Sequence, residues 1–184
     1  MADRAARSRY STVAIVLHWG MALLLIGNLA AGLFFDLIED ADKALFFTLV
    51  QLHKATGVTI LGLAVLRLAW RLMNPPPPYP DHMTPAERVL AKLSHWGFYA
   101  LMIALPLTGW AMVSTAKMKF PMLWYGLFEI PSLPVPVGWN YGWLHGALGW
   151  LAVAMIVLHV AAALKHHYLD RDHIFARMAF GRRS

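Results

Sequence analysis

Four long apolar runs divide the chain, and each is separated from the next by a polar or proline-rich segment. The runs cover residues 12–35, 44–70, 92–113 and 143–164. An α-helix needs about 20 mainly apolar residues to cross a bilayer, and every run reaches that length. The pattern therefore predicts an all-α fold, an integral membrane four-helix bundle that forms a single membrane domain over residues 1–184.

The connecting segments differ in composition, and each indicates a different kind of connection. Residues 36–43 contain four acids and one lysine, which favours a tight, solvated loop on the outer side. Four consecutive prolines at 75–78, followed by Pro80 and Pro85, cannot continue a helix and predict an extended connector. Residues 114–141 mix prolines with aromatic side chains, as is typical of chain lying at the membrane interface.

Two local signals refine the third run. Thr84, Pro85 and Glu87 predict a helix start, with threonine as the N-cap and proline at the first helical position. Pro106 interrupts the run. We expect the Thr108 hydroxyl or a neighbouring helix to satisfy the backbone carbonyl that the proline leaves free.

Composition supports a membrane protein and excludes several cofactors. Of the 184 residues, 59% are hydrophobic and 14% are charged, which is too apolar for an ordinary soluble domain of this size. The chain has no cysteine, so iron–sulfur clusters, thiolate-ligated haem and covalently attached haem are excluded. The formal charge of +6 comes without a basic stretch interleaved with aromatic residues, and we expect no nucleic-acid partner.

Lysine and arginine are distributed unevenly around the four runs, and this predicts the orientation. Twelve of the sixteen flank the runs on the side that holds both chain ends, including the basic tail at 165–184. The other four are Lys43, Lys54, Lys117 and Lys119. Because cytoplasmic segments carry the excess of basic residues, both termini are predicted to be cytoplasmic, in a protein surrounded by membrane lipid.

The fourth run contains two histidines, His145 and His159, fourteen positions apart. On an α-helix this spacing brings the second side chain to within roughly 40° of the first and separates the two by about 21 Å. An ionisable residue inside a membrane span is costly and usually has a partner or a function. Since imidazole is an axial ligand of haem iron, the two histidines predict two haem b groups, one near each membrane surface.

Six-coordinate haem needs two histidines, so the other runs must supply partners at matching depths. His53 and His145 lie early in runs that are entered from outside, and together they form the outer pair. His159 lies late in the fourth run, at the inner level, and both His18 and His95 lie at that level too. Depth alone leaves the inner partner of His159 open between these two.

Three further positions fall at the level of a haem. Arg67 lies fourteen residues after the outer histidine of its own run, at the inner level. It is either a partner for a haem propionate or a topology-setting arginine that extends to the interface. Gly32 and Gly109 lie fourteen residues after the inner histidines of their runs, at the level of the outer haem, where a small residue permits close approach.

The remaining four histidines lie outside the apolar runs. His82 in the proline connector and His173 in the tail are expected to be solvated. His166 and His167 follow the fourth run, and we expect one of them to face a pocket in the inner leaflet. The alternative is a wet, interfacial pair.

Five short motifs give the chain a family resemblance. They are His-Trp at 18–19, Gln-Leu-His-Lys at 51–54, Val-Leu-Arg-Leu at 65–68, Ile-Ala-Leu-Pro at 103–106 and Leu-His-Val-Ala-Ala-Ala-Leu-Lys-His-His-Tyr at 158–168. With these motifs the chain resembles the bacterial cytochrome b561 family over nearly its whole length. Within that family it looks most similar to the short di-haem superoxide oxidases, also called superoxide:ubiquinone oxidoreductases.

The resemblance implies a bacterial inner-membrane enzyme that moves electrons from superoxide, on the periplasmic face, through two b haems to ubiquinone. It implies that His18 and His159 bind the inner haem and that His166 lies beside the quinone. His95 is the next candidate for the quinone site. The outer loop between the third and fourth runs departs most from the family, which leaves the electron donor open.

Capture of a small anion such as superoxide requires positive charge near the outer haem. The outer side as a whole has five acids against four basic residues. Lys54, however, follows His53 directly, and Lys117 and Lys119 follow the third run. We expect these three lysines to form a local positive approach for superoxide.

Two alternative functions follow from the same residues. One is an electron-transfer subunit that docks a separate redox partner protein, such as a hydrogenase, through its outer loops. The other is a divalent metal transporter that uses the histidines as ligands. Transport favours carboxylates along a path through the membrane, and the acids of this chain lie in loops and tails, which disfavours that alternative.

Overall fold

The computed structural model describes residues 9–118 and 120–180, and it is built mainly from helices. Within this part of the chain, four helices are long and apolar enough to cross a membrane. They are α1 (Thr12–Leu33), α3 (Lys43–Met73), α4 (Pro85–Thr115) and α5 (Tyr141–Leu164). The all-α class predicted from the apolar runs is therefore confirmed.

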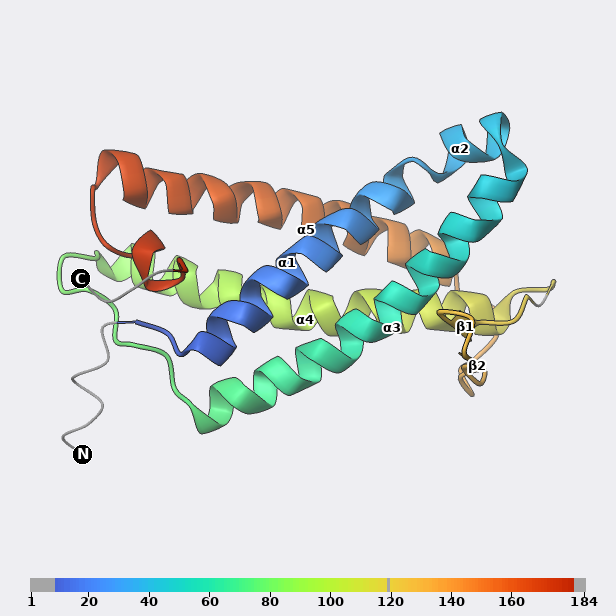
Figure 1. The fold of residues 1–184 in the computed structure, drawn as a ribbon, viewed down its shortest axis with the longest axis horizontal. Helices are drawn as coiled ribbons and strands as arrows, with labels where there is room; N and C mark the ends of the chain where they lie inside the picture. The colour runs from blue at the N-terminus through green and yellow to red at the C-terminus, as the bar shows by residue number, and fades with distance from the viewer. Residues whose placement is uncertain (1–8, 119, 181–184) are drawn as a thin grey trace.

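Helices that follow one another in the chain pack side by side. α4 lies against both α3 and α5, and α3 lies against α1. Figure 1 shows α4 and α5 running alongside each other, while α1 and α3 cross the view at an angle to them. α1 also meets α5 where the rings of His18 and His159 approach, with centroids 6.2 Å apart. Packing between the helices thus brings histidines from different helices together.

Buried side chains form two small clusters between the helices. The larger joins α1, α3 and α4 and contains Met21, Ile60, Ala64, Tyr99 and Met102. The smaller joins α4 and α5 and contains Leu101, Leu105 and Ala152. Many other large apolar side chains of the helices are exposed on the outside of the bundle. An apolar outer surface suits contact with lipid, whose tails are as apolar as these side chains.

A short helix replaces the tight loop expected at residues 36–43. α2 (Phe35–Ala41) carries Asp36 in its first turn, where the helix dipole favours a carboxylate. Asp42 then caps α3, because its Oδ1 accepts hydrogen bonds from two backbone N–H groups of the first turn at 2.9 and 3.0 Å. Acids that suggested a solvated loop therefore stabilise two helix N-termini.

The predicted start of α4 is confirmed. The Thr84 hydroxyl accepts from the Glu87 N–H at 3.3 Å, and Glu87 Oε2 accepts from the Thr84 N–H at 2.9 Å, which together form a capping box. Pro85 occupies the first helical position. α4 therefore begins ahead of the apolar run at 92–113.

Pro106 lies inside α4, where it removes one backbone hydrogen bond. The Thr108 hydroxyl donates to two nearby backbone carbonyls at 2.8 and 2.9 Å, the second being that of Leu105. The carbonyl that a proline frees lies four residues before it, which here is that of Met102. Thr108 therefore stabilises the turn beside the proline and is not the group that satisfies the freed carbonyl, while the alternative of a neighbouring helix stays a prediction.

The interfacial segment at residues 114–141 contains a β-hairpin that the apolar pattern did not indicate. β1 (Leu123–Trp124) pairs antiparallel with β2 (Phe128–Glu129). Tyr125 and Gly126, in the turn, have φ angles of 47° and 78°. Tight hairpin turns favour such left-handed values, which glycine adopts readily and tyrosine rarely does.

This hairpin is fixed against α3 by polar groups of its aromatic side chains. The Trp124 indole N–H donates to the Thr59 hydroxyl at 3.1 Å. The Tyr125 hydroxyl lies 3.1 Å from the hydroxyl of Thr56. The outer segment is therefore folded onto the helix that carries His53, at the end of the bundle opposite the tail (Figure 1).

The chain after α5 folds back over the start of α1. α5 continues as a π-helical turn, η2 (Lys165–Leu169), and a 3-10 turn, η3 (Phe175–Arg177), follows. The Tyr10 N–H donates to the Arg177 carbonyl at 3.3 Å, and the Trp19 indole N–H donates to the Met178 carbonyl at 2.8 Å. The two ends of the described chain thus lie at the same end of the bundle (Figure 1). We call this the tail end and the opposite one the hairpin end.

Candidate functional site

His53 on α3 and His145 on α5 face each other in the half of the bundle toward the hairpin end. Their ring centroids are 6.0 Å apart, and the ring planes meet at 83°. His53 Nδ1 lies 3.1 Å from the backbone carbonyl of Asn28, and His145 Nδ1 lies 3.0 Å from that of Leu105. A carbonyl only accepts, so each Nδ1 carries the hydrogen and each Nε2 keeps its lone pair for a metal ion.

The spacing of these two rings suits two ligands on one ion. A metal–imidazole bond is about 2 Å long, and a ring nitrogen lies about 1 Å from its ring centre, so two imidazoles on opposite sides of an ion have centroids about 6 Å apart. The observed separation is 6.0 Å. His53 and His145 therefore fit the axial positions of a haem, and the structure brings the expected outer pair together.

Two glycines lie directly against these rings. A Cβ atom added at Gly32 would lie 3.3 Å from Cε1 of His53, and one added at Gly109 would lie 3.0 Å from Cε1 of His145. Both distances are shorter than an ordinary van der Waals contact. The two glycines therefore leave room for the imidazole rings of the outer pair, and the close approach of a porphyrin face to them stays a prediction.

Three histidines meet at the inner level. The ring of His159 lies 6.2 Å from that of His18 and 6.3 Å from that of His95, measured between centroids. Either distance suits a pair of axial ligands by the argument given for the outer pair. The spacing of the rings therefore does not decide whether His18 or His95 is the partner of His159, just as depth in the membrane did not.

The nitrogen atoms of the inner rings have different surroundings from those of the outer rings. Arg67 Nη2 lies 3.1 Å from His18 Nδ1. Because guanidinium only donates, His18 Nδ1 accepts and its ring hydrogen lies on Nε2. His95 Nδ1 is buried and makes no hydrogen bond within the described residues. Neither ring is held by a backbone carbonyl in the way that His53 and His145 are.

Arg67 belongs to a cationic group at the inner level. The guanidinium carbons of Arg67 and Arg71 each lie 5.8 Å from the centre of the Tyr99 ring, within the range of a cation–π contact. No carboxylate pairs with Arg67 in the part of the chain that the structure describes. The guanidinium is therefore positioned to receive a carboxylate from a bound group.

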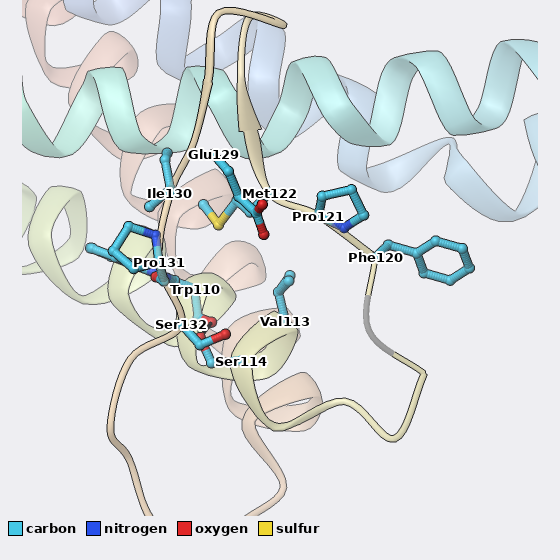
Figure 2. A pocket seen from close by; sticks show the side chains of 10 residues that line it. All are labelled: Trp110, Val113, Ser114, Phe120, Pro121, Met122, Glu129, Ile130, Pro131 and Ser132. Carbon is cyan, nitrogen blue, oxygen red and sulfur yellow. Dashed lines mark hydrogen bonds between the residues drawn. The ribbon is translucent and has the colours of Figure 1, made fainter.

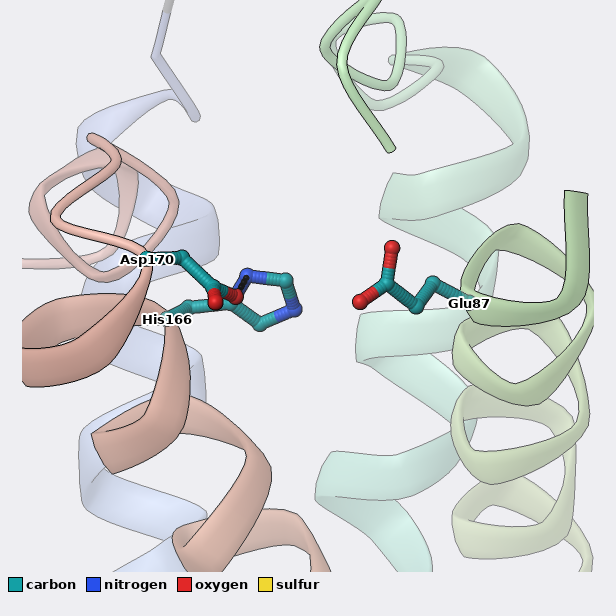
Figure 3. Close-up of side chains that lie close together, drawn as sticks. All are labelled: Glu87, His166 and Asp170. Carbon is teal, nitrogen blue, oxygen red and sulfur yellow. Dashed lines mark ion pairs between the residues drawn. The ribbon is translucent and has the colours of Figure 1, made fainter. Parts of the chain in front are cut away.

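A polar cluster lies at the tail end, where α5 passes into η2. His166 is 12% exposed, and its Nδ1 lies 2.7 Å from Oδ2 of Asp172 and 3.1 Å from Oδ2 of Asp170. Lys165 Nζ pairs with Asp170 at 2.6 Å and with Glu87 of α4 at 3.0 Å. Figure 3 shows Glu87 approaching His166 and Asp170 from the facing helix.

The ligand atoms of Glu87, His166 and Asp170 lie within 4.8 Å of one another, a spacing that suits a metal ion. The Lys165 ammonium already neutralises both carboxylates. A metal ion would have to displace that ammonium, so the cluster is better described as a satisfied ion-pair network around His166.

Asp172 and His82 belong to this cluster, and the sequence did not indicate either. The His82 side chain is exposed, as expected, and its Nε2 also lies 3.1 Å from Asp172 Oδ2. Burial tends to raise the pKa of Asp172, but hydrogen bonds from the Ile174 N–H, His82 and His166 together hold the pKa below its usual value. His82 and Asp172 are 90 positions apart in the sequence, and no local sequence pattern predicts a contact over such a separation.

His167 lies outside this cluster. Its ring packs edge-on against Tyr168 with centroids 4.6 Å apart and lies 5.2 Å from that of Phe175. His167 and His173 are both exposed. Of the two histidines that follow α5, His166 is therefore the one that turns inward.

The structure describes two of the three lysines expected to guide superoxide. Lys54 Nζ donates to the Pro121 carbonyl at 3.3 Å, which ties the residue after His53 to the outer loop. Lys117 is exposed beyond the end of α4. Lys119 lies outside the described residues. Positive charge is thus present near the outer pair at Lys54, and the approach that also includes Lys117 and Lys119 stays a prediction.

A cavity of about 170 Å³ lies between the end of α4 and the hairpin segment. Figure 2 shows its lining, which includes Trp110, Phe120, Glu129 and Pro131. Glu129 is the one charged group among the lining residues, and it is acidic. Its carboxylate disfavours an anion, so this cavity is not the approach that superoxide requires.

Membrane-length helices that bring imidazoles together at two levels define the class of the protein. This arrangement is that of a membrane protein that binds haem and carries electrons. The chain belongs to the prokaryotic cytochrome b561 family, whose model matches residues 9–181. The resemblance inferred from the sequence motifs is therefore confirmed.

Three relatives cover almost the whole chain. Cytochrome b561 homolog 2 of Escherichia coli (strain K12) is 33% identical over 174 residues, which are 92% of this chain and 90% of that protein. Probable superoxide oxidase CybB of Yersinia pestis is 30% identical over 170 residues, 92% of this chain and 95% of the relative. Cytochrome b561 homolog 1 of Escherichia coli (strain K12) is 23% identical over 180 residues, with 93% and 97% covered.

Family membership establishes the general activity. The protein is a bacterial membrane protein that binds haem b and transfers electrons, so it is an oxidoreductase in contact with lipid and with redox substrates. Divalent metal transport is set aside, because the chain belongs to an electron-transfer family.

Proposed function

We propose that the protein holds two b haems and moves electrons from superoxide at the periplasmic face to ubiquinone. The observation that carries this proposal is the pair His53 and His145, with rings 6.0 Å apart and both Nδ1 atoms held by backbone carbonyls. Rings fixed in this way keep Nε2 free, and the two histidines would hold a haem iron through it. When bound, haem b supplies reversible one-electron transfer.

The ligands of the two haems follow from this geometry together with the family resemblance. His53 and His145 hold the outer haem, and His159 with His18 holds the inner haem. His95 is the alternative inner ligand, since its ring is equally near to His159. If His18 is the ligand, His95 is left at the inner level as a candidate for the quinone site.

Arg67 has a different partner when the inner haem is bound. A histidine that ligates through Nε2 carries its hydrogen on Nδ1, and that hydrogen would meet the guanidinium, which also donates. The contact between Arg67 and His18 must therefore break when His18 ligates iron. Arg67 would then be free to bind a haem propionate, and the two charges would neutralise each other.

Superoxide as donor rests on the relatives and on the outer lysines. The relative from Yersinia pestis carries the name probable superoxide oxidase. Lys54 follows ligand His53 directly, and Lys117 with Lys119 supplies further positive charge on the outer side. We assign the hairpin end to the periplasm and both termini to the cytoplasm of a bacterial inner membrane, because basic residues predominate at the tail end.

The reaction balances with ubiquinone as the acceptor. Two superoxide anions lose one electron each and become dioxygen, and one ubiquinone gains both electrons and two protons to become ubiquinol. His166, half-buried at the tail end, is the residue we place beside the quinone, with His95 as the second candidate. Protons for the quinone then come from the cytoplasmic side.

A stopped-flow measurement with purified protein tests the donor and the acceptor together. We expect superoxide to reduce the haems rapidly, and a soluble ubiquinone analogue to reoxidise them. Failure of superoxide to reduce the haems, with normal reoxidation by the quinone, would remove superoxide as the donor.

A second candidate, an electron-transfer subunit that serves a redox partner protein, is favoured by one observation. The hairpin end carries acids on α2 and on β2, including Asp36, Glu39, Asp40 and Glu129. An acidic surface repels an anion and attracts a basic protein. If superoxide fails as donor, this surface is where a partner would dock.

A further inference from the structure

A buried carboxylate lies at the tail end, and the proposed electron path does not use it. The Asp172 side chain is 6% exposed. Its Oδ2 accepts from His166 Nδ1 at 2.7 Å and from His82 Nε2 at 3.1 Å, while Oδ1 accepts from the Ile174 N–H at 2.9 Å. One oxygen atom therefore bridges two imidazoles from segments that are far apart in the chain.

The fold builds this bridge with an unusual turn. α5 continues into the π-helical turn η2, and Arg171 then adopts a φ of 52°, in the left-handed region. The reversal is closed by the Asp172 N–H, which donates to the His166 carbonyl at 3.1 Å. The turn thereby returns Asp172 to the histidine that lies six residues earlier.

His82 reaches the bridge from the proline connector, which is itself held in place. Met83 is buried, and its carbonyl accepts from Arg88 Nε at 3.0 Å. Arg88 Nη2 also donates to the carbonyls of Pro80 and Asp81, at 3.2 and 3.1 Å. The connector is therefore tied to α4 on both sides of His82.

The three side chains lead from solvent to the interior, because the first is exposed and the other two are largely buried. The His82 side chain is 57% exposed, Asp172 is 6% exposed and His166 is 12% exposed. Imidazole titrates near neutral pH and has two nitrogens, so it can accept a proton on one and release a proton from the other. A carboxylate between two imidazoles can accept a proton from one of them and pass it to the other.

We propose that His82, Asp172 and His166 form a proton relay that carries protons from the cytoplasm to the quinone beside His166. This relay rests on the proposed function, because ubiquinone must gain two protons with its two electrons. His82 takes a proton from water and passes it to Asp172 Oδ2. This transfer uses the tautomer of His166 that carries its hydrogen on Nε2, in which protonated Asp172 passes its proton to the bare Nδ1 as Nε2 releases its hydrogen to a quinone oxygen. The products are the Asp172 carboxylate and the Nδ1–H that donates to it in the structure. Tautomerisation of the ring, with the hydrogen moving from Nδ1 to Nε2, then resets the relay.

Other charged groups face His166, and they define a competing route. Asp170 Oδ2 lies 3.1 Å from His166 Nδ1, but Asp170 is 31% exposed and paired with Lys165. Glu87, from α4, is paired with the same lysine. Both of these carboxylates are held by an ammonium, whereas the bonds to Asp172 come from two imidazoles and a backbone N–H.

Proton uptake, measured beside haem oxidation, tests the relay. The haem-loaded protein is reduced, freed of excess reductant and mixed with a soluble ubiquinone analogue in weakly buffered solution that contains a pH indicator dye. In the wild type we expect proton uptake to keep pace with haem oxidation. In Asp172→Asn we expect uptake to be slower by about a hundredfold, the lower range for loss of a proton-transfer group, with both haem spectra unchanged.

Three further variants make the result specific. His82→Ala changes an exposed side chain, so folding should be unaffected, and we expect slow uptake that added imidazole restores. Asp81→Asn removes an exposed carboxylate from the same connector and should behave as the wild type. Asp170→Asn tests the competing route, and slow uptake in this variant with normal uptake in Asp172→Asn would overturn the relay.

Failure of the relay and failure of the proposed function give different results. Normal haem oxidation with unchanged proton uptake in both Asp172→Asn and His82→Ala would overturn the relay alone. Wild-type haems that ubiquinone does not oxidise would overturn the proposed acceptor, and the relay with it.

Discussion

His53 and His145 lie with their ring centroids 6.0 Å apart, and each ring is fixed by a backbone carbonyl of a helix other than its own. The imidazoles come from α3 and α5, and the carbonyls of Asn28 and Leu105 come from α1 and α4. All four long helices therefore contribute to the outer site. The site depends on how the helices pack, so small changes beside the rings should affect cofactor binding.

Gly109→Ala should weaken the outer haem site. The added Cβ would lie 3.0 Å from Cε1 of His145, so the ring or the helix must shift. Strain of this kind costs about 1–3 kcal/mol, and we expect roughly tenfold weaker retention of the outer haem. Spectral titration with haem measures the loss, and Gly32→Ala, at 3.3 Å from His53, should show a smaller one.

Gly20→Ala is the matched control for both variants. It lies on α1, and apart from its chain neighbours and the backbone of its own helix, nothing lies within 4 Å of the Cβ that the substitution adds. Haem retention equal to that of the wild type is expected. An equal loss in Gly20→Ala and Gly109→Ala would mean that the effect does not arise at the ring.

The inner ligand is decided by comparing His18→Ala with His95→Ala. Because haem needs both axial bonds, we expect His18→Ala to lose the inner haem and to keep the outer one. His95→Ala should keep both haems and show altered reoxidation by a ubiquinone analogue. Retention of the inner haem in His18→Ala, with its loss in His95→Ala, would assign His95 as the ligand.

Arg67→Gln should lower the reduction potential of the inner haem. Removing a cation beside a bound propionate stabilises the oxidised form, and we expect a fall of about 60 mV, equivalent to a tenfold change in a one-electron equilibrium. A redox titration measures the shift, with both haems retained. Arg71→Gln should have a smaller effect, since Arg71 does not contact His18. An unchanged potential in Arg67→Gln would place the propionate elsewhere.

Lys54→Gln and Lys117→Glu should slow the reduction of the haems by superoxide. Both remove positive charge on the outer side, and the rate for the wild type should fall as salt is added, because screening acts over about 8 Å at physiological ionic strength. Lys43→Glu, which changes an exposed residue at the start of α3, should have less effect. A rate that is indifferent to salt and to Lys54 would favour a protein donor.

The sequence predicts the outer pair because helical periodicity and direction of entry together fix depth. His53 and His145 are the two histidines that enter from the outer side within the apolar runs, so depth leaves one pairing. At the inner level, His18 and His95 share a depth, and even the folded rings are 6.2 and 6.3 Å from His159. The distance between rings therefore does not decide whether His18 or His95 is the second ligand of the inner haem.

Other features depend on contacts that no local pattern encodes. The hairpin turn has Tyr125 at a φ of 47°, a value that tyrosine rarely adopts. The Asn-Gly or Gly-rich pair that usually marks a tight hairpin turn in a sequence is therefore missing here. The bridge from His82 to Asp172 spans 90 positions and depends on the left-handed turn at Arg171. Both arise from tertiary packing that overrides local preference.

The number of b haems per chain is the most direct test of the two-site arrangement. It is measured by pigment extraction and low-temperature spectra of the purified protein and of His53→Ala, His145→Ala and the exposed-residue control His173→Ala. We expect two low-spin haems in the wild type and in the control, and one in each of the other two variants. One haem per chain in the wild type, or two that survive His53→Ala, would contradict the assignment of His53 and His145.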